Sequence, residues 1–306
     1  MTDPQLPETL AEAAPRLGLR VYGASTLGVR RSALEAAGVP QAMPAVRHVA
    51  GEVSVGAEYE LEDGRVVPLS DQNLGTWGVG LDEVLDAARE RLSDGEITGI
   101  SALGEGVYLI ENELLVAAAL LAPELVSGLP VTGDLTLLPA AGPVAVCTGS
   151  EHAAGLGAAL NIVDQLAEAE VRTETAVPLV LRDDAWQPFD VAAAHPELAR
   201  AVALAERLAA VDAYGAQSGV LTDDAFIAKA KLFTKPDGDA VMVATWTDGV
   251  ETLLPQTDEV LVVRGENDVT PYPFAEFLER AGSSAVQVDT VPVRYRVSGD
   301  ALSALR

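Results

Sequence analysis

The chain has 306 residues, an apolar share of 49% and a formal net charge of −26. This length and composition are typical of a globular protein of about two domains with a substantial buried core. So strong a negative charge repels phosphates, which argues against binding to nucleic acids and to anionic membranes. Cys147 is the only cysteine, so no disulfide can form within the chain, which fits a reducing compartment.

The start of the chain lacks the pattern of a secretory signal peptide. Residues 1–10 are polar and acidic rather than basic and then apolar. The longest apolar run, residues 114–123, is too short to span a bilayer and ends at a proline. We therefore expect a cytoplasmic protein without a membrane segment.

The negative charge is distributed unevenly along the chain. Residues 51–134 contain 17 acidic residues and three arginines, whereas residues 1–48 contain four acidic residues and five arginines. This concentration predicts either an acidic surface for a basic partner or a surface that only keeps the protein in solution.

The strongest local signal begins at residue 52. Residues 52–61 alternate apolar side chains with small or charged ones, which predicts a half-buried antiparallel strand with one face in water. Residues 62–65 contain a glycine and predict a turn, after which residues 66–69 return as the second strand of a hairpin.

A short helix and a longer one follow this hairpin. We expect Ser70 or Asp71 to cap a turn that ends near Trp77, whose ring covers the end of the core. The helix over 81–92 has one apolar face, formed by Leu81, Val84, Leu85, Ala88 and Leu92.

The remainder of the first half alternates strands with helices. Ser150 is expected to cap a long helix. The predicted strands are 97–103, 106–110, 135–138, 144–148, 177–181 and 186–189, and the predicted helices are 113–126 and 150–170.

The second half opens with a helix over 196–213 and then a hairpin. In the hairpin, residues 226–235 pair with residues 240–246. All three lysines of the protein, Lys229, Lys231 and Lys235, share one face of the first strand. They indicate a protected edge strand or, alternatively, a surface that contacts an acidic ligand. Further strands are predicted at 259–263 and 286–297, with a short helix at 273–281.

These elements predict an α+β protein of two domains, each a largely antiparallel or mixed sheet packed with helices. Residues 1–48 form an N-terminal helical and connector segment. The first α+β domain covers residues 49–192, and the second covers residues 193–306 with its antiparallel hairpin.

Part of the first domain resembles a known family. The segment GEVSVGAEYELEDGRVVPLSDQNLGTWGVGLDEVLDAARERL contains a strand pair, a loop, the pair Trp77-Gly78 and a helix. Later come LLAPEL at 120–125 and VPLVLRDDAWQPFD at 177–190. Over roughly residues 50–190 the chain resembles the bacterial family of unknown function typified by YtpQ-type proteins. The resemblance implies an α+β domain and brings neither a settled activity nor catalytic residues.

Motifs of several common enzyme classes are absent from the sequence. There is no GxxxxGK[ST] phosphate loop, no GxGxxG turn between a strand and a helix, no HExxH and no GxSxG. One cysteine and three histidines do not make a usual zinc site. Ser150, Glu151 and His152 are the residue types of a catalytic triad, but neighbours at a helix start diverge. We therefore expect no cofactor, no metal and no catalytic residue.

The absence of a catalytic constellation, together with the concentrated acidity, predicts a non-enzymatic binding or accessory protein. An immunity-like role towards a basic protein partner is one form of this function. The alternative is a small-molecule hydrolase or another enzyme with a site between the domains. A structural subunit that associates through sheet edges is a third hypothesis, and the oligomeric state stays open. Candidate binding residues, chosen by chemistry and loop position, are Asn73, Trp77, His152, Trp246 and Asp248.

Overall fold

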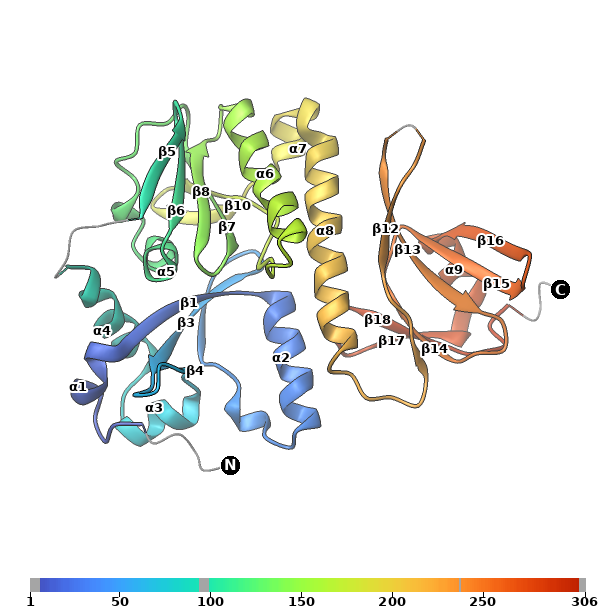
Figure 1. The fold of residues 1–306 in the computed structure, drawn as a ribbon, viewed down its shortest axis with the longest axis horizontal. Coiled ribbons are helices and arrows are strands. Elements are labelled where there is room, and N and C mark those ends of the chain that lie inside the picture. Colours follow the sequence, from blue (N-terminus) through green and yellow to red (C-terminus); the bar gives the residue numbers. More distant parts are fainter. Residues whose placement is uncertain (1–5, 94–98, 237, 303–306) are drawn as a thin grey trace. The chain divides into compact units, whose positions relative to one another are not determined.

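The computed structural model describes residues 6–93, 99–236 and 238–302, and it confirms the α+β class (Figure 1). Ile97 and Thr98, at the start of a predicted strand, lie outside the described residues. So do Asp237 in the predicted hairpin turn and the first five residues of the chain.

The chain divides into two compact units. Unit 1 comprises Met1–Ala24 and Gly38–Val202, and unit 2 comprises Ser25–Ala37 and Ala203–Arg306. The predicted domains, residues 49–192 and 193–306, stay a prediction; the compact unit 1 extends to Val202, and unit 2 also includes Ser25–Ala37.

The first sheet of unit 1 is antiparallel, and β3 lies at its centre. The strand β3 pairs with β1 along one edge and with β2 and β4 along the other. The sequence analysis did not assign β1. The strands are β1 (Leu17–Gly23), β2 (Val46–Ala50), β3 (Val53–Glu60) and β4 (Val66–Pro68).

The prediction that one face of β3 lies in water is wrong. Every residue from Val53 to Tyr59 is buried. The second face carries the small residues Ser54 and Gly56 and, further along, the buried Glu58. Neighbouring groups approach closely here: a Cβ added at Gly56 would lie 2.9 Å from the Ala45 carbonyl oxygen and 3.0 Å from the Tyr22 ring. The alternation along this strand therefore does not mark a face in water.

Two helices follow this sheet as predicted. Ser70 is the N-cap of α3 (Asp71–Trp77), and Gly78 ends that helix at φ 68°. Helix α4 (Leu81–Ser93) packs against β1 and β3. Its buried side chains are Val84, Leu85 and Ala88.

The second sheet of unit 1 has the strand order β10-β9-β7-β8-β6-β5 and is antiparallel throughout. Helix α6 (Ala153–Glu168) packs against β7 and β8. The strands are β5 (Ile100–Gly104), β6 (Val107–Glu111), β7 (Leu135–Ala141), β8 (Val144–Gly149), β9 (Leu179–Arg182) and β10 (Ala185–Pro188).

Helix α5 (Glu113–Leu121) joins the two sheets of unit 1 into one core. Residues Leu115–Leu120 are all buried, and the helix packs against β1 and β3 of the first sheet and β6 and β8 of the second. The α-helix ends earlier than predicted because Pro123 opens the short 3₁₀ helix η3 (Pro123–Leu125), and the residue before a proline avoids helical geometry.

The expected helix cap at Ser150 is also wrong. The N-cap of α6 is His152. The Ser150 hydroxyl instead accepts a hydrogen bond from the backbone N–H of Asp134, at 2.9 Å. The remaining elements of this half are α1 (Leu10–Ala13), η1 (Ala14–Arg16), η2 (Pro40–Ala42), α7 (Val191–Ala194) and η4 (Pro196–Leu198).

Unit 2 contains two four-stranded sheets, in the orders β11-β14-β18-β17 and β12-β13-β15-β16. Most pairs are antiparallel, but β11 with β14 and β13 with β15 are parallel. The strands are β11 (Phe226–Ile227), β12 (Lys231–Thr234), β13 (Ala240–Thr247), β14 (Thr252–Pro255), β15 (Glu259–Gly265), β16 (Asp268–Pro273), β17 (Ala285–Val288) and β18 (Arg294–Val297).

The predicted single strand over 226–235 divides into β11 and β12, which belong to different sheets. Strand β12, which contains Lys231, lies at a sheet edge, as the lysines of this segment predicted. The core of unit 2 contains Trp246 and Phe277, with ring centroids 5.9 Å apart. The helices assigned wholly or mainly to unit 2 are α2 (Ala24–Ala36), α8 (Ala199–Ser218), α9 (Phe274–Ala281) and the 3₁₀ helix η5 (Gly282–Ser284).

Within the described ranges, no helix has both the length and the apolar character needed to cross a membrane.

Candidate functional site

Two of the residues proposed from the sequence lie on α3 and stabilise it locally. The Asn73 Oδ1 atom accepts a hydrogen bond from the Ser70 backbone N–H at 2.8 Å, as part of a capping box. The Trp77 ring packs against the core of unit 1, as expected, and its Nε1–H donates to the Pro7 carbonyl at 2.8 Å.

The other three are spread over both units. In unit 1, His152 Nδ1 lies 3.3 Å from the Thr148 hydroxyl. In unit 2, Trp246 is fully buried in the core, and Asp248 lies after β13, where its backbone N–H donates to the Val263 carbonyl. None of the five candidates lines either of the two cavities described below.

A different group of residues forms a site in unit 1, where β1, β3 and α5 meet. In the β1–β3 pairing Gly18 is opposite Glu58, and Arg20 is opposite Gly56. A Cβ at position 18 would lie 3.1 Å from Glu58 Cγ, so the glycine leaves room for this side chain. Arg20 is the diagonal neighbour of Glu58 on the same face of the sheet, within reach of a long side chain.

Two carboxylates lie at ion-pair distance from the Arg20 guanidinium, and neither forms a hydrogen bond with it. Arg20 Nη1 lies 3.8 Å from Glu58 Oε2 and 3.9 Å from Glu113 Oε1. Glu113 lies in the first turn of α5, where the helix dipole favours a negative charge. Glu58 is the more buried partner, with a side chain 10% exposed against 34% for Glu113.

The Glu58 carboxyl group lacks a hydrogen-bond partner for one of its oxygens, although Arg20 lies at ion-pair distance from it. Among the described residues, no group makes a hydrogen bond with the buried Oε2 atom. A buried carboxylate in this position costs free energy, because an ionised oxygen needs donors when water is removed. The pKa of Glu58 is raised to about 7, mainly by burial and also by the nearby Glu113 carboxylate, while Arg20 acts in the opposite direction.

Glu58 lies in the lining of a cleft of about 200 Å³. We call this cavity the Glu58 cleft. Its lining combines carboxylates with arginines: Arg16 is exposed, and one Nη1–H of Arg91 is donated to the Leu17 carbonyl. The lining residues are Arg16, Gly18, Leu19, Glu58, Glu60, Val66, Arg91, Glu113 and Leu114.

This arrangement offers two kinds of chemistry. A carboxyl group that titrates near neutrality in a cleft can accept a cationic donor when it is ionised, or exchange a proton with a bound molecule. Over the ranges that the structure describes, no cluster of histidine, cysteine, aspartate or glutamate side chains is arranged to hold a metal ion.

The sequence analysis missed the Glu58 cleft for identifiable reasons. It placed Glu58 on a wet strand face, and it gave residues 17–23 no structure. The signal was present in LGLRVYG, where Arg20 interrupts an apolar run of strand-forming residues. A charge in such a run favours an acidic partner nearby, because charges that become buried are usually paired.

Comparison with known proteins finds no matching family model, no matching curated protein and no matching solved structure. The resemblance of residues 50–190 to the YtpQ-type family stays a prediction.

Proposed function

We propose that the protein is a non-enzymatic cytoplasmic binding protein, and that the Glu58 cleft of unit 1 accepts one cationic side chain of a basic protein partner. The observation that carries the proposal is that Glu58 lines a cleft while its buried Oε2 atom has no hydrogen-bond donor among the described residues. An ammonium or guanidinium group supplies the donors that an ionised carboxylate requires.

The charge of unit 1 favours a protein over a small amine as the source of this cation. Over the residues assigned to unit 1, the sequence has 29 acidic residues and nine arginines, a net charge of −20. A net charge of this size produces a negative electrostatic potential over a surface much larger than one cleft. This potential increases the association rate with a basic macromolecule. An immunity-like role, in which the acidic unit neutralises a basic protein, is the form of this function that we favour.

The arginines of the cleft limit what it can accept. Arg20 already balances part of the charge of Glu58 and Glu113, and Arg16 and Arg91 contribute two further cations to the lining. The cleft is therefore suited to a single cationic group rather than to a cluster of them.

Affinity capture at low and high salt tests this proposal. We expect the wild-type protein to retain a basic protein at low salt and to release it at high salt, because salt screens exposed charges. The Glu58→Gln variant should lose most of this retention. Glu124→Gln is the matched control, since it makes the same substitution at an exposed position of the same unit outside the cleft.

Two results would contradict the proposal. One is a capture in which wild type retains no basic protein at low salt. The other is a basic protein that Glu58→Gln retains as well as Glu124→Gln does, because retention would then depend on net charge and not on the cleft.

A small-molecule hydrolase is the second candidate, and the pair of neighbouring carboxyl groups favours it. One protonated and one ionised carboxyl group are the parts that acid–base hydrolysis uses. A panel of ester, amide and glycoside substrates checks this function. Turnover that both Glu58→Gln and Glu113→Gln abolish would establish the hydrolase and displace the binding proposal.

A further inference from the structure

A second cavity lies in unit 2, on the sheet that contains β12, β13 and β15. One face of this sheet is in the core, where Trp246 and Val262 pack with Phe277 of α9. Side chains alternate along a strand, so Val243 and Thr245 of β13 point to the opposite face. The cavity lies on that opposite face, as its lining residues show.

The cavity has a volume of about 330 Å³ and a mostly apolar lining. We call it the lysine groove. The pairing of β12, β13 and β15 places Lys231 opposite Val243, and Thr245 opposite Leu261. The lining residues are Phe226, Ile227, Ala228, Lys229, Lys231, Phe233, Val243, Ala244, Thr245 and Leu261.

Two phenylalanines of the groove are exposed. Phe226 is 60% exposed and Phe233 is 50% exposed. Large apolar side chains gathered at one place on a surface commonly mark a binding site, whereas single ones do not. These two rings come from β11 and β12, which belong to different sheets, and both line the same cavity.

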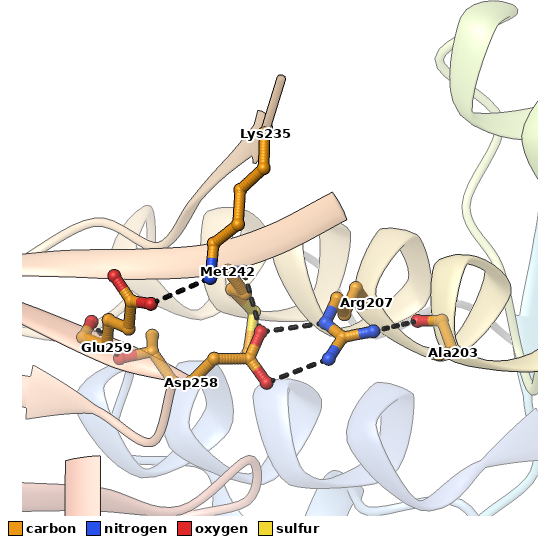
Figure 2. Close-up of polar contacts among 7 residues, drawn as sticks. Ala203, Arg207, Lys235, Met242, Asp258 and Glu259 are labelled. Atoms are coloured by element: carbon orange, nitrogen blue, oxygen red, sulfur yellow. Dashed lines mark hydrogen bonds and ion pairs between the residues drawn. The ribbon is translucent and has the colours of Figure 1, made fainter. Parts of the chain in front are cut away.

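The groove also contains positively charged side chains, although the protein as a whole is strongly acidic. Two of the three lysines, Lys229 and Lys231, line it, and both are exposed. Among the described residues neither forms an ion pair or a hydrogen bond through its ammonium group. The third lysine, Lys235, lies outside the groove and binds Glu259 at 3.0 Å (Figure 2).

We propose that the lysine groove binds a small amphipathic anion, a molecule with an apolar body and one carboxylate or sulfonate group. The apolar body would lie against Val243 and Leu261 between the two phenylalanine rings. The anionic group would meet the ammonium groups of Lys229 and Lys231. This site is independent of the Glu58 cleft and of the proposed basic partner.

The size and the charge of the groove select this class of ligand. A volume of about 330 Å³ is at the lower end of the range for small-molecule sites, which argues for a small ligand rather than a protein segment. A metabolite without an apolar part is disfavoured, because the floor of the groove is apolar. A neutral or cationic ligand is also disfavoured, because it carries no negative charge to complement the two lysines.

Fluorescence titration with anilinonaphthalene sulfonate, an aromatic anion, provides the first test. We expect saturable binding that octanoate displaces, whereas octanol and octylamine displace the probe at least about tenfold less well. Octanoate, octanol and octylamine have the same chain length, so the comparison isolates the charge of the head group.

Variants assign the binding to the groove. The double variant Lys229→Gln/Lys231→Gln should weaken binding of the probe by about tenfold, as expected for two partly exposed ion pairs. Lys235→Gln is the matched control, and it should bind within about twofold of wild type. Phe233→Ala, an exposed position, should weaken binding without disturbing the fold, which circular dichroism verifies.

Three outcomes would overturn the proposal: no saturable binding, displacement by octanol as efficient as by octanoate, and equal effects of the double variant and Lys235→Gln. Light scattering during the titration tests whether a second copy of the chain occupies the groove instead. If dimer formation displaces the probe and octanoate has no effect, the proposal of a small anionic ligand is wrong.

Discussion

Glu58 in unit 1 and Arg294 in unit 2 are both buried charged side chains, but they differ in how far their hydrogen bonds are satisfied. In unit 2, Arg294 is fully buried and its guanidinium donates hydrogen bonds to five acceptors. In unit 1, Glu58 is buried with one oxygen unsatisfied among the described residues. A satisfied buried charge holds a fold together, whereas an unsatisfied one is available to a ligand.

The surroundings of Arg294 explain why it is structural. Its acceptors include the Tyr214 carbonyl and the Ser218 hydroxyl at the C-terminal end of α8, where the helix dipole favours a cation. The Tyr214 ring also lies under the guanidinium, at 5.2 Å. Burial lowers the pKa of Arg294 to about 10, which leaves it charged at neutral pH.

Replacing Arg294 should have the largest effect on stability. Arg294→Met leaves five acceptors without their donor, and we expect the free energy of unfolding to fall by about 3–5 kcal/mol. Hydrogen exchange should show that the loss is concentrated in β14, β18 and the end of α8. Arg280→Met, on the surface of α9, is the control and should cost about 0.5 kcal/mol. Similar losses in both variants would show that the Arg294 cluster is not a structural centre.

Replacing Glu58 should act in the opposite direction. Its pKa is raised from 4.5 to about 7, so the folded protein holds a proton that the unfolded chain has lost between these values. The stability contributed by this group therefore declines as the pH rises from about 4.5 to 7. Glu58→Gln removes the penalty and should stabilise the protein by about 2–3 kcal/mol at about pH 8, with little gain at about pH 4.

Thermal unfolding of Glu58→Gln and Glu60→Gln across this pH range provides the measurement. Glu60 lies in the same cleft but is exposed, so its variant should follow wild type. A Glu58→Gln variant that is less stable than wild type at about pH 8 would mean that the carboxylate has a partner in the folded protein, contrary to our account.

A smaller effect is expected at the ion pair that joins α8 to Asp258, the residue before β15, in unit 2. Arg207 binds both oxygens of Asp258, at 2.7 and 3.0 Å, and Asp258 also accepts the Met242 N–H (Figure 2). Burial alone would raise the pKa of Asp258, but these hydrogen bonds hold it below its usual value. The stabilisation is therefore present at neutral pH and is lost as the pH falls through the lowered pKa.

We expect Arg207→Met to reduce the free energy of unfolding by about 1–2 kcal/mol at neutral pH, since the pair is partly exposed. Urea unfolding at two pH values measures this. The difference from wild type should shrink when Asp258 is protonated in both proteins, and a difference that grows in acid would contradict the assignment.

The sequence was most informative for elements whose apolar or charged residues all lie on one face. The apolar stripe of Leu81, Val84 and Leu85 predicted α4, and the three lysines predicted that β12 is an edge strand. It was least informative where the burial of a residue depends on pairing with a strand that is distant in the sequence. Glu58 is buried because β1 packs beside β3, and β1 itself was not recognised.

The candidate site shows the same limit. Asn73 and Trp77 were chosen for their chemistry, yet both side chains form local hydrogen bonds that stabilise α3 or its contact with the start of the chain. Arg20, Glu58 and Glu113 are far apart along the sequence, and only the fold brings both carboxylates within 4 Å of Arg20 Nη1. No local pattern in the sequence encodes that meeting.

We propose that Glu58 is a buried carboxyl group that binds a cationic partner. Carbon NMR tests this proposal most directly. Titration of glutamate side chains labelled with carbon-13, with Glu58→Gln for assignment, gives the pKa of this group directly. The account predicts a pKa of about 7 in the free protein, which falls when a cationic partner binds. A Glu58 that titrates near 4.5 in the free protein would contradict it.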